Sequence, residues 1–394
     1  MLIGLCGKPS SGKSTFFKAA TLAEVEIANY PFTTVKSQEG VAFVKLNCVD
    51  KEFNKQCNPR FGYCINSQRF VPVKLMDIPG LIPGAHKGLG MGNQFLDDIR
   101  QADALIHVID VSGSTNEKGE LVNPGDYNPA NDIKFLEEEL DYWYLGIIKK
   151  GWEKFARTIQ QEKLNIIKAI AKQLSGLKVT EEIVAQAIKN LNENPTAWKE
   201  EDLLKLAGEL RKKSKPIIIA ANKLDVTVSE KNLEKLKKEF KDYMIIGCSA
   251  EAELTLREAA KDRIIDYIPG DNKFKIINNK ISDAQKKALE FLNNYLNKFK
   301  TTGIQEILND SVFRLLKYIT VFPGGVNKLE DSDGNVLPDC FLMEPGTTAL
   351  DFAFRIHEDL GKKFIKAIDV RTKQAKGKEH KLKDRDIIEI VTRK

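Results

Sequence analysis

The stretch that decides the fold is Gly7-Lys8-Pro9-Ser10-Ser11-Gly12-Lys13-Ser14, which fits the pattern GxxxxGK[ST]. It follows a short apolar run at residues 1–6 and opens a segment of helical character at 14–20. A predicted strand, a glycine-rich turn and a predicted helix, in this order, are the context of a phosphate-binding P-loop. The glycines let backbone N–H groups converge on phosphate oxygens, and the start of the helix adds to the attraction.

Two side chains of this loop have predicted roles of their own. Lys13 brings a positive charge to the β- and γ-phosphates, so we assign it both to nucleotide binding and to catalysis. The Ser14 hydroxyl is placed to bind Mg²⁺. With Thr15 added, residues 7–15 form the predicted phosphate-binding set for a nucleoside triphosphate.

Further apolar runs indicate the architecture around this loop. Residues 70–76, 104–110, 216–221 and 243–248 have strand character, and the last three are continuous runs typical of buried parallel strands. Helical segments separate them. This alternation predicts an α/β fold with a doubly wound, mainly parallel sheet.

Two regions depart from the alternation. Residues 132–213 carry heavy charge and helical periodicity, as at Leu136, Leu140 and Tyr144, so we predict a helical insertion in preference to a coiled-coil protein. From 318 onward, short β-type runs surround a helical segment at 349–360, which indicates a small α+β domain. The predicted organisation is a nucleotide-binding domain at 1–270 with an insertion at about 132–213, a helical connector at 271–317, and the α+β domain at 318–394.

A second nucleotide motif ends the strand predicted at 70–76. Asp77-Ile78-Pro79-Gly80 places a carboxylate where it can hold Mg²⁺ through water, and the Gly80 N–H where it can meet the γ-phosphate. Such a loop responds to the presence of the γ-phosphate. We therefore assign Asp77 to the metal ligands, together with Ser14, and Gly80 to catalysis.

The predicted base-binding residues follow the last two strands of the nucleotide-binding domain. Asn222-Lys223-Leu224-Asp225 comes after 216–221, and Ser249-Ala250-Glu251 comes after 243–248. The Asp225 carboxylate can accept hydrogen bonds from guanine N1 and N2, a donor pair that adenine lacks. Asn222 can brace the loop, the Lys223 stem can cover the base, and the Ala250 N–H can meet guanine O6. These residues favour GTP over ATP.

Together, these motifs resemble those of translation-factor-related GTPases, and more narrowly of the Obg-related branch. Asn29-Tyr30-Pro31-Phe32-Thr33-Thr34 resembles the family's switch I, and DIPGLIPGAHKGLG at 77–90 resembles its glycine-rich switch II. From 318 onward, above all at 344–353, the chain resembles a TGS domain. The insertion and the TGS domain together most resemble archaeal-type relatives of the YchF GTPases. YchF proteins often lack the guanine-reading Asp and can prefer ATP, but this chain retains Asp225.

The resemblance implies roles in the two switch segments. Thr34, in preference to Thr33, corresponds to the switch I threonine, a Mg²⁺ ligand that also serves catalysis. Ras-like enzymes hold a glutamine after the switch II glycine to orient water, but Leu81 stands here and carries no polar group. The resemblance therefore implies slow hydrolysis of GTP to GDP, accelerated by a partner. It leaves K⁺ dependence open, because Ser10 stands where K⁺-dependent relatives carry Asn.

Composition limits the class of protein and its expected location in the cell. Hydrophobic residues make up 42% and charged residues 29% of the 394, which excludes a disordered tail protein or a fibre. No apolar run approaches ~20 residues and the first residues lack a basic leader, so we expect no membrane span, no signal peptide and a cytoplasmic location. The net charge of +6 permits an anionic partner without demanding one.

The cysteines show no obvious metal motif. Six of them stand at positions 6, 48, 57, 64, 248 and 340, without a CxxC pair. Cys57 and Cys64 bracket a segment of hairpin character, where a metal site or a disulfide is the alternative. Because closely spaced ligand pairs are lacking, we expect unpaired thiols in a reducing cytosol.

Three functions compete at this point. The first is a GTP-hydrolysing switch whose TGS domain or helical insertion contacts ribosomes or RNA, as the resemblance implies. A basic strip gives that partner modest support; it consists of Arg371, Lys373, Lys376, Lys378, Lys381, Lys383 and Arg385. The second is an ATP-using YchF-like hydrolase, or an ATP-dependent kinase or synthetase, which Asp225 opposes. The third is a nucleotide-dependent binding module without catalysis, which Leu81 keeps open. The sequence does not indicate an oligomeric state.

Overall fold

The computed structural model describes residues 1–22, 38–80, 92–278 and 281–393. Contacts divide these residues into two compact units, which we describe separately. Unit 1 consists of 1–19, 38–40, 74–80, 92–278 and 281–307, and unit 2 of 20–22, 41–73 and 308–393. The boundaries predicted at 270 and 318 stay predictions, while the contacts group residues 41–73 with the C-terminal region.

The main sheet is of the predicted kind. Its order is β2-β4-β1-β5-β6-β7, with β3 paired to β4. β1 lies parallel to both β4 and β5, and β5, β6 and β7 continue in parallel. The strands are β1 (Leu2–Cys6), β2 (Glu39–Asn47), β3 (Tyr63–Ile65), β4 (Gln68–Asp77), β5 (Ala104–Asp110), β6 (Ile217–Asn222) and β7 (Met244–Gly247).

Four helices accompany this sheet along the chain: α1 (Lys13–Thr21), α2 (Gly92–Gln101), α8 (Ser229–Glu239) and α9 (Ala250–Lys261). Every residue of β5 and β6 is buried, because helices cover both faces of a parallel sheet and its strands must then be apolar throughout. Ile99, Ile109 and Ile219 belong to the resulting core. The carboxyl ends of the parallel strands are thereby fixed at one edge, where the polar motifs follow.

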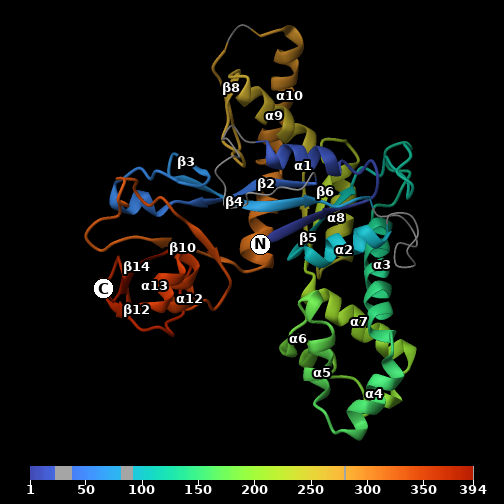
Figure 1. Ribbon diagram of the computed structural model, residues 1–394. Helices are drawn as coiled ribbons and strands as arrows, with labels where there is room; N and C mark the ends of the chain where they lie inside the picture. Colours follow the sequence, from blue (N-terminus) through green and yellow to red (C-terminus); the bar gives the residue numbers. More distant parts are fainter. Residues whose placement is uncertain (23–37, 81–91, 279–280, 394) are drawn as a thin grey trace. The chain divides into compact units, whose positions relative to one another are not determined.

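The region predicted as an insertion is helical. Its helices are α3 (Ala130–Lys149), α4 (Trp152–Gln161), α5 (Ile166–Gln173), α6 (Glu181–Ala187) and α7 (Glu200–Ser214), drawn in green to yellow-green in Figure 1. α3 takes part in two cores: Ile133 and Leu136 pack in the core of the sheet, whereas Tyr144 and Ile148 pack in the core of the insertion. This one long helix therefore joins the insertion to the sheet.

A helical segment ends unit 1. After α9 come β8 (Ile265–Asp266), β9 (Lys275–Ile276), α10 (Asp283–Phe299) and α11 (Ile304–Asp310). Leu256 of α9 packs with Leu289 and Leu292 of α10. Throughout the described ranges, no helix has the length and apolar character required to cross a membrane.

The C-terminal part of unit 2 is the predicted α+β fold. Its strands are ordered β11-β10-β14-β12-β13, and β10 pairs in parallel with β14. The elements are β10 (Ile319–Pro323), β11 (Phe341–Met343), α12 (Ala349–Ile356), α13 (Glu358–Lys362), β12 (Phe364–Asp369), β13 (Ala375–Lys376) and β14 (Asp386–Thr392). α12 begins after Thr348, which forms a capping box with Asp351, and Phe352 packs against Val321 and Ile388.

Candidate nucleotide-binding site

The P-loop lies between β1 and α1 and has room for glycine only at two positions. Gly12 has φ +88°, and a Cβ there would lie 2.1 Å from Asn222 Nδ2. A Cβ on Gly7 would lie 2.3 Å from the Val108 carbonyl oxygen. Ser11 is buried and its hydroxyl donates to the Lys8 carbonyl at 3.0 Å, whereas Pro9 and Ser10 are exposed. The loop is therefore tightly packed at Gly7, Ser11 and Gly12, whereas Pro9 and Ser10 keep exposed surface.

Asn222 connects two of the predicted motifs to each other. Its Nδ2 donates to the Ser11 carbonyl oxygen at 3.0 Å, and its Oδ1 accepts from the Ala250 N–H at 2.9 Å. The predicted bracing role of Asn222 thus has direct geometric support. The Ala250 N–H, predicted to meet guanine O6, is already bonded here, so guanine would have to share it with Asn222.

Lys13 and Asp77 form an ion pair. Their side chains are 12% and 24% exposed, respectively. Ser14, in the first turn of α1, is exposed, and Thr15 beside it is half-buried. A hydroxyl and a carboxylate are the hard oxygen donors that Mg²⁺ prefers, so Ser14 and Asp77 fit the predicted ion.

The start of switch II lies beside the P-loop. A Cβ on Gly80 would come within 3.5 Å of the Pro9 ring. Thr33, Thr34 and Leu81 lie outside the described residues, and their roles stay predictions.

The predicted base-reading residues differ in how they are engaged. Asp225 is exposed in the turn after β6, and in the described part of the chain its carboxylate forms no hydrogen bond or ion pair. Lys223 has φ +67°, and its ammonium group bonds Asp110 at 2.9 Å. The Ser249 hydroxyl caps α9 by accepting from the Ala252 N–H, and Glu251 is exposed in the first turn. The Asp225 carboxylate is therefore available to a ligand.

Asp110 is a supporting residue that the sequence analysis missed. It is fully buried at the end of β5, opposite Asn222 in the neighbouring strand. Burial opposes its ionisation, but hydrogen bonds from Ser112 and Lys223 outweigh burial and hold the pKa of Asp110 below its ordinary value. The sequence did contain a signal for it, because Asp110 is a carboxylate at the end of a strand predicted to be buried and parallel.

Lys8 was predicted to bind nucleotide, yet its side chain points to the loop that follows β5. Lys8 is 5% exposed, donates to the Thr115 carbonyl at 2.8 Å, and forms an ion pair with Asp132 at 3.0 Å. Its ammonium group lies 3.8 Å from the centre of the Tyr127 ring. Burial lowers the pKa of Lys8, and Asp132 opposes this effect. Only the Lys8 backbone is therefore left for phosphate.

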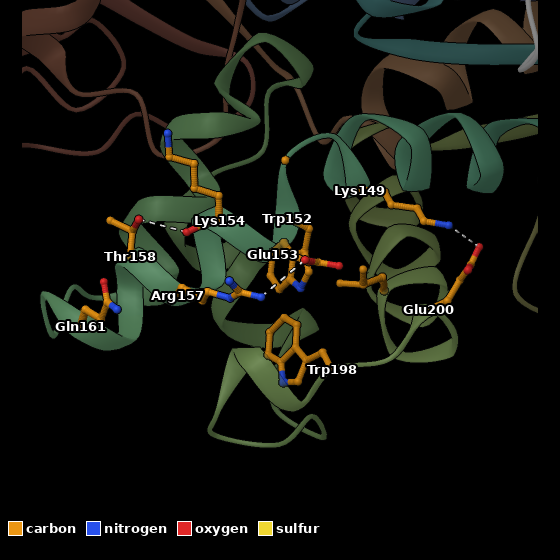
Figure 2. A pocket seen from close by; sticks show the side chains of 11 residues that line it. Lys149, Trp152, Glu153, Lys154, Arg157, Thr158, Gln161, Trp198 and Glu200 are labelled. Carbon is orange, nitrogen blue, oxygen red and sulfur yellow. Dashed lines mark hydrogen bonds and ion pairs between the residues drawn. The ribbon is translucent and has the colours of Figure 1, made fainter.

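A separate groove lies in the helical insertion and has a volume of about 830 Å³ (Figure 2). The stacked rings of Trp152 and Trp198, 5.3 Å apart, form part of its wall. Four of its charged side chains are paired, Glu153 with Arg157 and Lys149 with Glu200, and Lys154 also lines it. The groove contains none of the predicted nucleotide-binding residues.

Three family models match successive parts of the chain. Residues 2–137 match the 50S ribosome-binding GTPases, and residues 220–325 match the G4-motif domain of Obg-like GTPases of the YGR210-like type. Residues 332–392 match the TGS domain. The matched ranges include the P-loop, Asp225 and the C-terminal α+β fold.

Similar proteins extend the likeness to the whole chain. GTP-binding protein MJ1332 of Methanocaldococcus jannaschii is 50% identical over 394 residues, 99% of each chain. A crystal structure of a GTP-binding protein from Pyrococcus horikoshii is 40% identical, covers 100% of both chains and has a TM-score of 0.77. The ribosome-binding ATPase YchF of Buchnera aphidicola is 28% identical over 374 residues, 92% of this chain and 86% of that one. The predicted resemblance is confirmed: the chain belongs to the Obg-like, YchF-related family of GTP-binding proteins.

Proposed function

We propose that this protein is a cytoplasmic GTPase that hydrolyses GTP to GDP and phosphate and acts as a switch on ribosomes or RNA. The observation that carries the proposal is the junction at Asn222, which holds the phosphate loop and the base-reading segment together. The exposed carboxylate of Asp225 follows three residues later. The Asn222 side chain thus helps to position both the phosphate-binding loop and the segment that selects guanine.

Catalysis in this proposal depends on rearrangement of an existing ion pair. Lys13 leaves Asp77 to bind the phosphates, which frees the Asp77 carboxylate. Ser14 and Asp77, with Thr34 as a predicted third ligand, would hold Mg²⁺, which when bound neutralises charge on the phosphates. The Gly80 N–H is assigned to the γ-phosphate. Since Leu81 cannot orient water, we expect slow turnover without a partner.

An ATP-using hydrolase is the second candidate. It is favoured by the name of the Buchnera relative, a ribosome-binding ATPase. Asp225 opposes it, because adenine offers no donor pair to the carboxylate. GTP is therefore the proposed substrate.

The proposed ribosome or RNA partner is supported by the 50S ribosome-binding family model and by the names of YchF relatives. In unit 2, the basic strip has less positive charge free for a partner than its composition suggests, because Arg371 and Arg385 both form ion pairs with Glu52 at 2.7 Å. Its lysines, all exposed except the half-buried Lys376, are Lys373, Lys376, Lys378, Lys381 and Lys383.

The test is multiple-turnover phosphate release from GTP and from ATP, with and without ribosomes. The background is set by Lys13→Ala, which lacks the phosphate-binding ammonium group. We expect GTP turnover above this background, further increased by ribosomes, and weak competition by ATP. Equal or faster ATP turnover would establish the second candidate. Turnover at background with both nucleotides, even with ribosomes, would leave a binding module without catalysis.

A further inference from the structure

Unit 2 contains a cluster of thiols and a carboxylate that has no part in the nucleotide site. Cys48, Asp50, Cys57 and Cys64 each place one ligand atom within 4.8 Å of those of the others. The sulfurs of Cys48 and Cys57 are 3.5 Å apart, and the Cys64 sulfur lies 3.8 Å from Asp50 Oδ2. All six cysteines of the chain belong to the described residues, and all are free.

The spacing of these atoms suits a single tetrahedral ion. Bonds of ~2.3 Å from zinc to sulfur, at tetrahedral angles, hold two sulfurs ~3.8 Å apart. The 3.5 Å between the Cys48 and Cys57 sulfurs lies close to this value. Three thiolates with one carboxylate make a soft ligand set that selects Zn²⁺ over the hard ion Mg²⁺.

The local fold brings together four side chains that lie within 17 residues of the sequence. Cys48 precedes a short 3₁₀ helix, Val49–Phe53, which carries Asp50. The Cys48 backbone N–H donates to the Ser67 carbonyl at 2.8 Å. Cys64 lies on β3, opposite Arg69 of β4. The β3–β4 hairpin therefore presents Cys64 to the segment that carries the other three ligands.

Asp50 supplies an independent sign that a cation belongs here. Its side chain is 0% exposed, and Oδ2 accepts the Cys57 N–H at 3.1 Å. Oδ1 is buried and has no hydrogen-bond partner within the described ranges. A fully buried carboxylate with one unpaired oxygen is costly, and a cation bound to that carboxylate offsets the cost of burying its charge.

The surroundings also suit such a site. Arg69 is 1% exposed, and its Nη1 lies 3.4 Å from the Cys57 sulfur. The same guanidinium group donates to the carbonyl oxygens of Leu337 and Pro338 at 3.0 and 2.9 Å. With Zn²⁺ bound, three thiolates and a carboxylate leave a charge of −2, which Arg69 reduces to −1. Hydrogen bonds to ligand sulfurs of this kind are common around structural metals.

We propose that Cys48, Cys57, Cys64 and Asp50 bind one Zn²⁺ ion in a closed, structural site. The ion stabilises the 48–65 segment within the core that this segment shares with Phe322, Leu337 and Ile387. The site is independent of GTP, so failure of the proposed GTPase activity would not affect it.

The test measures zinc in the full-length protein, purified under reducing conditions and dialysed against metal-free buffer. We expect about one zinc per chain, as structural sites require. Cys57→Ser and Asp50→Asn should lose most of it, and circular dichroism with GTP binding reports whether each variant is folded. The matched control is Cys340→Ser, which removes a thiol from the same core outside the ligand set. It should retain the zinc.

A second measurement does not depend on variants. Co²⁺ added to metal-free wild-type protein should give the absorption of tetrahedral cobalt–thiolate coordination, and Zn²⁺ should displace it. Zinc-free protein without that absorption, or with a Cys48–Cys57 disulfide in its mass spectrum, would overturn the proposal. So would loss of zinc in Cys340→Ser together with its retention in Asp50→Asn, because Asp50 would then not be the fourth ligand.

Discussion

The Asn222 side chain donates a hydrogen bond to the Ser11 carbonyl oxygen over 3.0 Å, which connects the NKxD segment directly to the P-loop. Its other end receives the Ala250 N–H. All three residues are buried, so neither bond can be replaced by bulk water. The positions of the phosphate-binding and base-binding segments consequently depend on a single amide group.

Asn222→Ala should weaken GTP binding although Asn222 need not touch the nucleotide. The change removes two hydrogen bonds and leaves a buried carbonyl and a buried N–H unpaired, at a cost of about 2 kcal/mol in stability. To the extent that GTP binding restores the arrangement of the two segments, this cost weakens binding, by at most roughly 30-fold in Kd. Titration calorimetry measures the change. The control is Asn232→Ala, which removes a similar amide bond to the Val111 carbonyl but not to the P-loop. Equal losses in both variants would contradict the bracing role.

Asp225→Asn should exchange guanine for xanthine specificity. Loss of the charged acceptor should weaken GTP binding roughly 10- to 100-fold, the range for a hydrogen bond to a charged group. The new amide can donate to the carbonyl that xanthine carries in place of the guanine amino group. XTP should therefore bind the variant better than it binds the wild type. Asp242→Asn, another exposed aspartate of unit 1, is the control. An unchanged preference for GTP over XTP would remove Asp225 from base recognition.

The Lys13–Asp77 ion pair predicts opposite effects of its two partners. Lys13→Ala should weaken nucleotide binding at least about 100-fold, because the phosphates lose a fixed positive charge. Asp77→Asn frees Lys13, so GDP binding without Mg²⁺ should equal or exceed that of the wild type. Adding Mg²⁺ should then tighten GTP binding more in the wild type than in Asp77→Asn, which lacks one of the predicted Mg²⁺ ligands. Fluorescence titration with labelled nucleotides, with and without Mg²⁺, measures both effects. Similar losses in both variants without Mg²⁺ would mean that the pair is merely structural.

The sequence predicted those strands and motifs whose defining residues are consecutive or regularly spaced along the chain. The continuous apolar run at 104–110 became β5 with those bounds, because both faces of that strand are covered. β2, at Glu39–Asn47, was not predicted, because its buried residues, Val41 to Val44, form a run of only four. Motifs with fixed spacing, such as the P-loop, could be predicted equally well.

Contacts between distant residues could not be predicted. The bond between Lys223 and Asp110 and the ion pair between Lys8 and Asp132 join residues more than a hundred positions apart. The thiol cluster was missed for another reason: Cys48, Cys57 and Cys64 lie within 17 residues but lack the short spacings of zinc motifs. They meet only because the hairpin turns Cys64 back onto the preceding segment.

Unit 2 also decides how partner binding should be tested. Deleting everything after residue 317 would remove Phe322, Leu337 and Ile387 from the core that they share with Cys48 and Val49. The truncated chain would expose that core, and a binding defect would then have two causes. Charge reversals on the exposed lysines leave the core in place.

The last prediction concerns those lysines. Reversing Lys378, Lys381 and Lys383 to Glu should weaken co-sedimentation with ribosomes, because contacts to phosphates release counterions. The slope of log affinity against log salt should fall by about three, one for each lost contact. The control reverses Lys235, Lys237 and Lys238, three exposed lysines of α8, and so changes the net charge equally. GTP binding should be unchanged in both variants. If the two triple variants pellet alike across the salt series, the C-terminal strip has no recognition role, and the helical insertion becomes the better candidate.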